Sequence, residues 1–331
     1  MANISSEKVV EVLEAGLQST VQDYPGRPGM LRQGFFPAGA MDHFAMRAAN
    51  LLVGNAQSAA GLEVVLGNVA LRFHSDVTVG VCGAEAELTV DGEQAPLWEG
   101  RAVEAGSELR VGISQGPGFR LYVAISGGID VPPLFGSRAT YTMGGLGGLD
   151  GRPLRQGDRL PVGNGSSARP RRFKETSRPR YTREWELEAV AGPQAAPDYL
   201  TEADMRTLFE RSWTVDRNSD RTGIRLESFR FQWARDGGGV AGGHPSNILD
   251  NPYPVGAVNL NGDLPVILGP DGPTAGGFVV AATIIHAAMW KTGQLRPIGD
   301  RLRFRQVTAE EAVELEREQR KVLSQASLED V

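Results

Sequence analysis

Short runs of alternating apolar and polar residues recur along the first half of the chain. Residues 77–81, 87–97, 107–113 and 119–125 follow the two-residue period of half-buried strands. In the second of these runs, Asp91 and Gly92 can take the positive φ angles that a two-residue hairpin turn requires. The pattern, together with 42 glycines and 20 prolines, predicts a mainly β protein with many tight turns.

Helical spacing is confined to a few short segments. Residues 42–53, 202–211 and 309–324 place apolar side chains at intervals of three and four, although the last of them is highly charged. A side chain that can cap the first turn precedes or begins each segment. The predicted caps are Asp42, Thr201 and Thr308.

A repeated order of motifs indicates an internal duplication. The segment from Leu121 to Gly157 and the segment from Leu264 to Gly299 have nearly the same length, and both run on into the tetrapeptide Gly-Asp-Arg-Leu. A chance similarity between two glycine-rich β segments is the alternative. The length of 331 residues agrees with two domains, because single cores stop growing near roughly 250–300 residues.

The expected domain limits follow from this repeat. Residues 1–165 form a first β domain, 166–184 a basic linker, 185–307 a second β domain, and 308–331 a charged C-terminal helix and tail. The basic stretch could hold a phosphate, but its own acidic residues and turn formers favour a solvated linker.

Composition narrows the functional classes. The net charge of -6 gives no general attraction to nucleic acid or to anionic membranes. The single cysteine, Cys82, excludes an internal disulfide and lies in a valine-rich strand, so a buried, inert thiol is expected. The four histidines show no ligand spacing, and no metal is predicted. The N-terminus lacks a signal-peptide core and the apolar run 276–290 is too short to span a bilayer, so a cytoplasmic protein is expected.

Two glycine-bounded stretches near the N-terminus offer charged side chains. Gln22, Asp23 and Arg27 surround a Pro-Gly turn, where the guanidinium could face a bound carboxyl group or pair with the carboxylate. In residues 34–55, Arg47 and Asn50 share a helix face, and backbone amides at 34–42 could hold an anion. Surface solvation and a polar helix end are the alternatives.

The stretch 242–266 is the richest in candidate chemistry. His244 follows two glycines and can act as a general base or a hydrogen-bond donor near neutral pH. Small polar side chains nearby can bond an uncharged amide or ureido group, and those at 259, 261 and 263 would share one strand face. A solvent-facing strand after a polar turn is the alternative. These side chains are Ser246, Asn247, Asn259, Asn261 and Asp263.

Two further segments complete the candidates. Lys291 follows the apolar run and could hold a carboxylate. The glycine-rich loop 269–277 lacks the spacing of a phosphate-binding P-loop, so it predicts only a close approach of backbone to backbone.

Several motifs, taken in order, resemble a known family. They are STVQDYPGRPGM, GFFPAGAMDHFAMRAANLLVGN, GLEVVL, GGLDGRPLRQGD, GDLPVILGPDGPTAGGF and GQLRPIGDRLRF, and they extend over about residues 13–307. They resemble the allophanate hydrolase subunit 2 family, which includes the biotin-dependent carboxyltransferase domain of urea carboxylase and a bacterial 5-oxoprolinase subunit. The fold that the resemblance implies is two tandem cyclophilin-like β-barrel domains with a few short helices.

The resemblance also implies an activity. The chain would transfer a carboxyl group from carboxybiotin to a small amide such as urea or a guanidine-like compound, and HPSN at 244–247 is closer to the urea-type branch. His244, Asp263 and Arg27 would be catalytic. Substrate would contact Ser246, Asn247, Asn259, Asn261 and Lys291, and carboxybiotin would contact Gln22, Asp23, Arg47 and Asn50.

The family implies partners as well. A separate domain or protein would carry the biotin, because no biotin-attachment Met-Lys-Met and no ATP-grasp region is present. The expected partners are a protein of the allophanate hydrolase subunit 1 family and a biotin carboxylase or carrier. Two alternatives stay open: a non-catalytic regulatory subunit that binds a subunit 1 partner, and a 5-oxoprolinase subunit.

Overall fold

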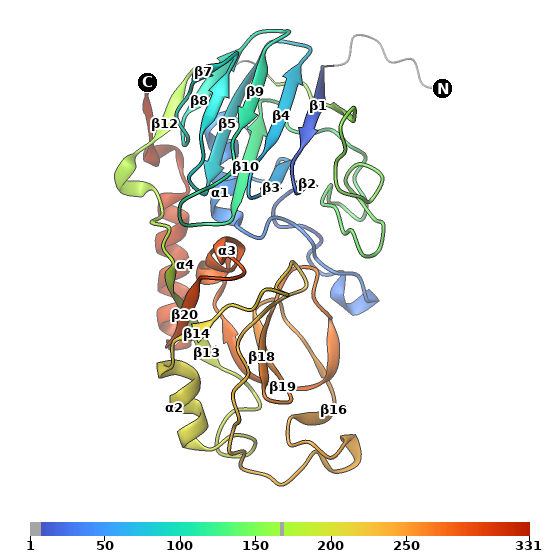
Figure 1. Cartoon of the computed structure of the whole chain (residues 1–331), viewed down its shortest axis with the longest axis vertical. Helices are drawn as coiled ribbons and strands as arrows, with labels where there is room; N and C mark the ends of the chain where they lie inside the picture. Colours follow the sequence, from blue (N-terminus) through green and yellow to red (C-terminus); the bar gives the residue numbers. More distant parts are fainter. Residues whose placement is uncertain (1–7, 166–168) are drawn as a thin grey trace. The chain divides into compact units, whose positions relative to one another are not determined.

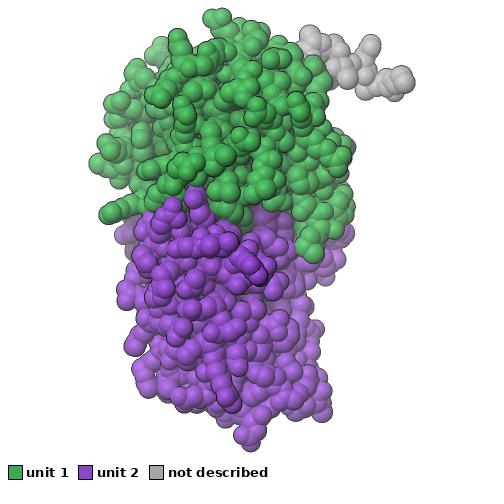
Figure 2. All heavy atoms as spheres, viewed as in Figure 1, with its two compact units in different colours: residues 1–28, 37–181, 320–331 green, residues 29–36, 182–319 purple. Residues whose placement is uncertain are grey.

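The computed structural model describes residues 8–165 and 169–331 and divides the chain into two compact units. Unit 1 contains Met1–Pro28, Pro37–Tyr181 and Arg320–Val331, and unit 2 contains Gly29–Phe36 and Thr182–Gln319 (Figures 1 and 2). Strands dominate both units, so the mainly β prediction is confirmed.

Unit 1 is built on two antiparallel sheets. The first has the order β11 (Arg159–Pro161), β1 (Val9–Ala15), β4 (Val69–Phe73), β9 (Glu108–Val111), β6 (Leu88–Val90), β7 (Glu93–Gln94). The second has the order β2 (Gln18–Gln22), β3 (Gly61–Val65), β10 (Arg120–Ile125), β5 (Val77–Gly83), β8 (Gly100–Val103). A two-stranded ladder joins β12 (Arg171–Phe173) to β21 (Leu328–Asp330), which follows the short 3-10 helix η4 (Gln325–Ser327); a further 3-10 helix, η2, spans Glu175–Ser177.

The core of unit 1 consists of aliphatic side chains from both sheets, and helix α1 (His43–Leu52) contacts β5 and β10. The Asp42 side chain caps this helix by accepting a hydrogen bond from Ala45 N at 2.8 Å. A Cβ atom at Gly100 would stand 2.7 Å from the Leu52 carbonyl oxygen. Glycine at that position therefore lets the end of the helix lie close against the sheet.

Unit 2 contains one large sheet. Its order is β14 (Trp213–Thr214), β20 (Arg301–Gln306), β13 (Glu184–Ala191), β19 (Ala275–Ile284), β17 (Ala257–Asn261), β18 (Leu264–Leu268), β15 (Gly223–Arg225). Strand β16 (Asn247–Pro252) also pairs with β19, and only β13 and β20 run parallel. The helices of this unit are α2 (Glu202–Glu210), α3 (His286–Gln294) and α4 (Ala309–Val322), with the 3-10 turns η1 (Leu31–Gln33) and η3 (Gly239–Ala241).

The predicted closed barrels are not present, which corrects that part of the expected fold. Each sheet ends in strands that have a single partner. The end strands β7 and β14 have two residues each, and β11 and β15 have three. In the two sheets that end in them, strands this short offer few backbone groups for a closing ladder. The second sheet of unit 1 ends instead in β2, with five residues, and β8, with four.

The two segments of the sequence repeat lead into strands that pair differently. Strand β11, which follows Gly157, pairs antiparallel with β1. Strand β20, which follows Gly299, pairs parallel with β13 and antiparallel with β14. The same tetrapeptide thus enters a three-residue strand in unit 1 and a six-residue strand in unit 2.

Most predicted local elements are confirmed. Helices α1, α2 and α4 occupy the three predicted segments, and Thr201 with Asp204 forms a full capping box. At the β6–β7 hairpin, Asp91 has φ 53° and Gly92 has φ 83°. Cys82 is buried and has no disulfide partner. Over 8–165 and 169–331, the helices are all too short or too polar to cross a membrane.

Candidate functional site

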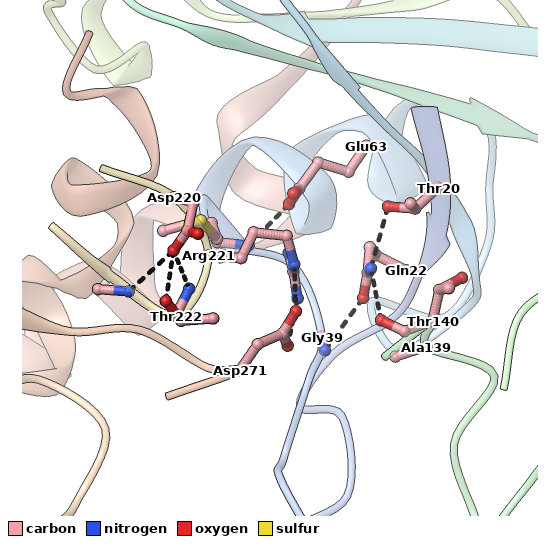
Figure 3. A network of polar contacts seen from close by, with 12 residues as sticks. Thr20, Gln22, Gly39, Glu63, Ala139, Thr140, Asp220, Arg221, Thr222 and Asp271 are labelled. Carbon is pink, nitrogen blue, oxygen red and sulfur yellow. Dashed lines mark hydrogen bonds and ion pairs between the residues drawn. The ribbon is translucent and has the colours of Figure 1, made fainter. Parts of the chain in front are cut away.

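Gln22 lies within a buried hydrogen-bond network of unit 1 (Figure 3). Its Nε2 donates to Thr20 Oγ1 and to the Thr140 carbonyl oxygen, both at 3.0 Å. Its Oε1 accepts from Gly39 N at 3.1 Å. The side-chain amide therefore ties β2 to the loop at Gly39 and to the segment at Thr140, which lies 118 positions along the chain.

Asp23 and Arg27 hold the same downstream segment. The Asp23 carboxylate accepts from Ser137 Oγ at 2.8 and 3.0 Å and from Arg138 N at 2.6 Å. Arg27 Nη2 donates to the Ala139 carbonyl oxygen. Burial raises the pKa of Asp23 above its ordinary value, while the two donors and the nearby Arg27 charge oppose that rise. These contacts fix loops within unit 1.

The backbone amides predicted to hold an anion before α1 have partners inside unit 1, which corrects that expectation for residues 39–42. Gly39 N donates to Gln22, as described above. Met41 N donates to Glu63 Oε2 at 2.8 Å. Asp42 N donates to the Tyr122 hydroxyl at 2.7 Å. The physical reason is that Glu63 and Tyr122 are buried, and their oxygens need donors.

Arg47 and Asn50 share a face of α1, as the sequence predicts, but both are buried. Arg47 Nε donates to Gln57 Oε1 at 2.7 Å, and its guanidinium carbon lies 4.7 Å from the centre of the Tyr24 ring. Asn50 Nδ2 donates to the Ala59 carbonyl oxygen at 2.8 Å. Surface solvation, the alternative for Arg47, does not describe these contacts.

In unit 2, His244 and Ser246 contact each other in the turn before β16. Ser246 N lies 3.1 Å from His244 Nδ1, and Ser246 Oγ lies 2.8 Å from the same nitrogen. Ser246 Oγ also accepts from Gly262 N at 3.0 Å. Because Nδ1 accepts the Ser246 amide hydrogen, this network assigns the proton of a neutral His244 ring to Nε2. His244 then acts as a donor through Nε2.

Asn259 and Tyr253 form a second polar contact of unit 2. The Tyr253 hydroxyl donates to the Phe278 carbonyl oxygen at 3.0 Å and accepts from Phe278 N at 2.7 Å. Because the Tyr253 hydroxyl already donates its hydrogen to Phe278, the Asn259 side chain must donate to the phenol oxygen through Asn259 Nδ2. Burial raises the pKa of Tyr253, and the bonds from Phe278 and Asn259 act in the opposite direction.

The Asn259 carbonyl oxygen is consequently turned away from Tyr253. Asn259 is 4 % exposed, and Val266 and Val280 stand directly opposite it on the neighbouring strands. Among the described residues, no donor lies within hydrogen-bond distance of Asn259 Oδ1. A buried acceptor without a donor costs about 1–3 kcal/mol, which a hydrogen bond from a ligand or a water would remove.

The Tyr253 hydroxyl and the Ser246 backbone bond consecutive residues of β19. Tyr253 bonds Phe278, and the Ser246 carbonyl oxygen accepts from Val279 N at 3.0 Å. Strands β16 and β19 are labelled in the lower part of Figure 1. We call His244, Ser246, Tyr253 and Asn259 the β19 site.

The predicted face of three polar residues does not extend along the whole segment. Strand β17 ends at Asn261, which is exposed, and Asp263 lies in the turn that follows. Asp263 Oδ1 accepts from Phe231 N at 3.3 Å. Asn247 is half-buried, and its backbone N–H donates to the His244 carbonyl oxygen at 3.0 Å.

Lys291 lies on α3 and has partners of its own. Its Nζ lies 2.6 Å from Glu188 Oε2 and donates to the Glu186 carbonyl oxygen at 2.8 Å. Both charged side chains of the ion pair are largely buried. The cation therefore neutralises a carboxylate of β13.

The loop 269–277 makes the predicted close approach. A Cβ atom at Gly269 would lie 2.1 Å from the Arg221 carbonyl oxygen. The Arg221 guanidinium and the Asp271 carboxylate form two parallel hydrogen bonds of 2.8 and 2.9 Å (Figure 3). This buried pair fixes the loop.

Sequence reasoning missed two residues beside His244. Arg235 Nε donates to the Pro245 carbonyl oxygen at 2.8 Å, and Nη2 donates to the Asn247 carbonyl oxygen at 2.6 Å. The Trp233 ring contacts the His244 ring. The alternation of aromatic and basic residues in FRFQWAR, just before a glycine run, is the signal that could have marked them. Among the residues described, no group of three or more His, Cys, Asp or Glu side chains could hold a metal ion.

Comparisons with known proteins agree with the motif order. Residues 33–306 match the family described as carboxyltransferase domain, subdomain A and B. The chain is 38 % identical over 302 residues to urea amidolyase of Saccharomyces cerevisiae, which covers 89 % of this chain and 16 % of that protein. It is 32 % identical over 323 residues to a 5-oxoprolinase subunit of Escherichia coli, which covers 96 % of this chain and 97 % of that protein.

A solved structure gives the same result. The crystal structure of K. lactis urea amidolyase superimposes with a TM-score of 0.92 at 37 % identity, over 100 % of this chain and 21 % of that one. The chain thus spans a small part of the urea amidolyases and nearly the whole of the 5-oxoprolinase subunit. The resemblance found in the motifs is confirmed: this chain belongs to the carboxyltransferase domain family, subdomains A and B, which it shares with urea amidolyase and the 5-oxoprolinase subunit.

Proposed function

We propose that this chain transfers the carboxyl group of carboxybiotin to a small uncharged amide such as urea. The observation that carries the proposal is the buried Asn259 Oδ1, for which the described residues supply no donor. Family membership supports the reaction class, and the names urea amidolyase and urea carboxylase of its relatives support the acceptor.

Asn259 recognises the acceptor through an N–H group. The contact with Tyr253 fixes the amide nitrogen, so only the carbonyl oxygen is presented to a ligand. A primary amide or urea supplies the matching N–H. Within the apolar setting of Val266 and Val280, that hydrogen bond offsets the desolvation of the oxygen.

His244 and Asp263 have separate roles toward the acceptor, one as a hydrogen-bond donor and one as a base. The Ser246 contacts keep the His244 proton on Nε2, which makes the ring a hydrogen-bond donor to the acceptor and not its base. Asp263 follows Gly262, whose amide bonds Ser246, and its carboxylate accepts from Phe231 N. We assign to it the removal of the proton from the attacking nitrogen.

Carboxybiotin, presented by a carrier domain or a partner protein, supplies the carboxyl group. The polar atoms of Gln22, Asp23 and Asn50 that are described above bond within unit 1, so their geometry does not fit direct contacts to the ureido ring. For these residues, and for Arg27 and Arg47, we propose an indirect role in holding the loops of unit 1. The partners we propose are a subunit 1 family protein and a biotin carboxylase or carrier.

A second acceptor is favoured by one observation. The 5-oxoprolinase subunit of Escherichia coli is matched over 97 % of its length. 5-Oxoproline carries a carboxylate that needs a cation, whereas Arg235 and Lys291 of unit 2 are engaged with chain oxygens. The β19 site therefore fits a neutral amide better than 5-oxoproline.

The test replaces Asn259 by leucine, with Asn261→Leu as the matched control. Asn261 lies two residues along the same strand and is exposed. Asn259→Leu is expected to lower kcat/KM for urea by about 10- to 100-fold, since the lost hydrogen bond to a buried group corresponds to about 1.4–3 kcal/mol. Asn261→Leu should leave it within about twofold. Equal activity of the two variants would exclude Asn259 as the acceptor-binding residue.

A further inference from the structure

The Trp233 indole carries a buried donor without an acceptor. Its Nε1 has no hydrogen-bond partner among the described residues, although the atom is shielded from solvent. Other tryptophans of unit 2 are satisfied: Trp213 Nε1 donates to the Leu208 carbonyl oxygen at 3.0 Å, and Trp185 Nε1 donates to Asp300 Oδ2 at 2.9 Å. Unpaired buried donors are rare in native proteins, and strain, a bound water or a ligand can account for one.

The backbone at Trp233 is strained, and the strain is held in place. Its φ is +59°, a left-handed value that bulky aromatic residues rarely adopt. Asp204 Oδ1 accepts from Gln232 N at 2.8 Å, and Asp204 Oδ2 accepts from Trp233 N at 3.0 Å. Ala234 N donates to the Tyr199 carbonyl oxygen at 3.0 Å. Strain that its surroundings enforce is concentrated at ligand sites.

The strained conformation places the indole against His244. The two ring centres lie 5.5 Å apart, and the ring planes are perpendicular at 89°. The neutral His244 ring carries its proton on Nε2, because Nδ1 accepts from Ser246. Each of the two rings in contact thus has one N–H group for which the described residues supply no acceptor.

We propose that Trp233 Nε1–H and His244 Nε2–H form a binding subsite for the carbonyl oxygen of a small neutral amide. The indole N–H is uncharged, and the Asp204 carboxylate, which accepts from the Trp233 backbone amide, disfavours an anion nearby. The subsite is argued from the unpaired Trp233 donor, the Nε2 proton of a neutral His244 ring and the contact of the two rings. Only the identification of its ligand with the carboxyl acceptor rests on the proposed function.

The experiment follows the indole N–H signals of the full-length chain in two-dimensional proton–nitrogen NMR spectra while urea is added. The signal of Trp233, identified by its loss in Trp233→Phe, is expected to shift and saturate. The indole signals of Trp185 and Trp213 are internal controls, because both N–H groups already have acceptors. Trp233→Phe should weaken urea binding by about 3- to 10-fold, as expected for one neutral hydrogen bond.

A second variant keeps the test decisive if Trp233→Phe unfolds. His244→Phe retains the ring contact and removes the second donor. The urea affinity read from the saturation of the Trp233 shift should therefore fall by about 3- to 10-fold. Acetate is the carboxylate probe, and a Trp233 shift as large with acetate as with urea would overturn the choice of a neutral carbonyl.

The outcomes separate this subsite from the proposed function. A Trp233 signal that stays unchanged while urea-dependent carboxyl transfer proceeds overturns the subsite alone. A saturating shift at Trp233 in a chain that never carboxylates urea supports the subsite and contradicts the proposed function.

Discussion

Replacement of Ser246 by alanine tests the tautomer argument for His244. Ser246 is fully buried, and its hydroxyl makes two contacts, one with His244 Nδ1 at 2.8 Å and one with Gly262 N at 3.0 Å. Alanine leaves the Gly262 amide without its acceptor. An unsatisfied, partly buried donor costs about 1–3 kcal/mol, which lowers the melting temperature of a unit of this size by about 2–10 °C.

The same replacement acts on the histidine. Without the hydroxyl, one of the two donors that keep Nδ1 unprotonated is lost. The ring then rotates or changes tautomer more readily, and Nε2–H is presented less often to the acceptor. We expect kcat/KM for carboxyl transfer to urea to fall by about tenfold, the equivalent of about 1.4 kcal/mol.

Ser219→Ala is the matched control. The Ser219 hydroxyl also lies in unit 2 and accepts a backbone amide, that of Arg225 at 3.0 Å, but it contacts no histidine. Calorimetry should show a smaller loss of stability in Ser219→Ala, because the exposed Arg225 amide can bond water instead, and the transfer assay should show a loss of activity in Ser246→Ala alone. A Ser246→Ala enzyme as active as Ser219→Ala would refute the role given to the hydroxyl.

Two further predictions follow from single carboxylates. Asp263→Asn should lower kcat for transfer to urea by about 100-fold or more, as expected for loss of a general base, with little change in KM; unchanged kcat in a steady-state assay would remove Asp263 from the mechanism. Burial raises the pKa of Asp23 above the ordinary value of 3.8. Ionisation of Asp23 therefore lowers the free energy of unfolding as the pH rises from 3.8 through the raised pKa. The free energy of unfolding of Asp23→Asn, relative to the unaltered protein, should therefore increase from pH 4 towards neutrality in chemical denaturation experiments, and a constant or falling difference would contradict the burial argument.

The sequence predicts the local elements because their causes are local. The cap at Asp42, the capping box at Thr201 and the hairpin at Asp91 each depend on residues within four positions of one another. Helix α3 was missed because its apolar residues continue the pattern of β19 without a capping side chain.

The hydrogen-bond partners of the candidate residues could not be predicted from the sequence. Gln22 and Asp23 bond residues more than 110 positions later in the chain, and no spacing rule reveals such pairs. Their residue types alone suggest that Gln22 and Asp23 could contact a ligand, whereas in the structure their side chains bond other parts of unit 1. At Trp233, a φ of +59° brings the indole to His244, and an aromatic residue gives no sign of that angle in the sequence.

The central claim is that a small amide accepts the carboxyl group from carboxybiotin on this chain. The most direct measurement mixes the chain and its subunit 1 family partner with a biotin carrier that bears radiolabelled carboxyl groups, and follows the label in single-turnover experiments with and without urea. The account predicts that label leaves biotin rapidly only with urea present and is recovered as carboxylated urea. Release of the label as carbon dioxide at the same rate in both reactions would contradict it.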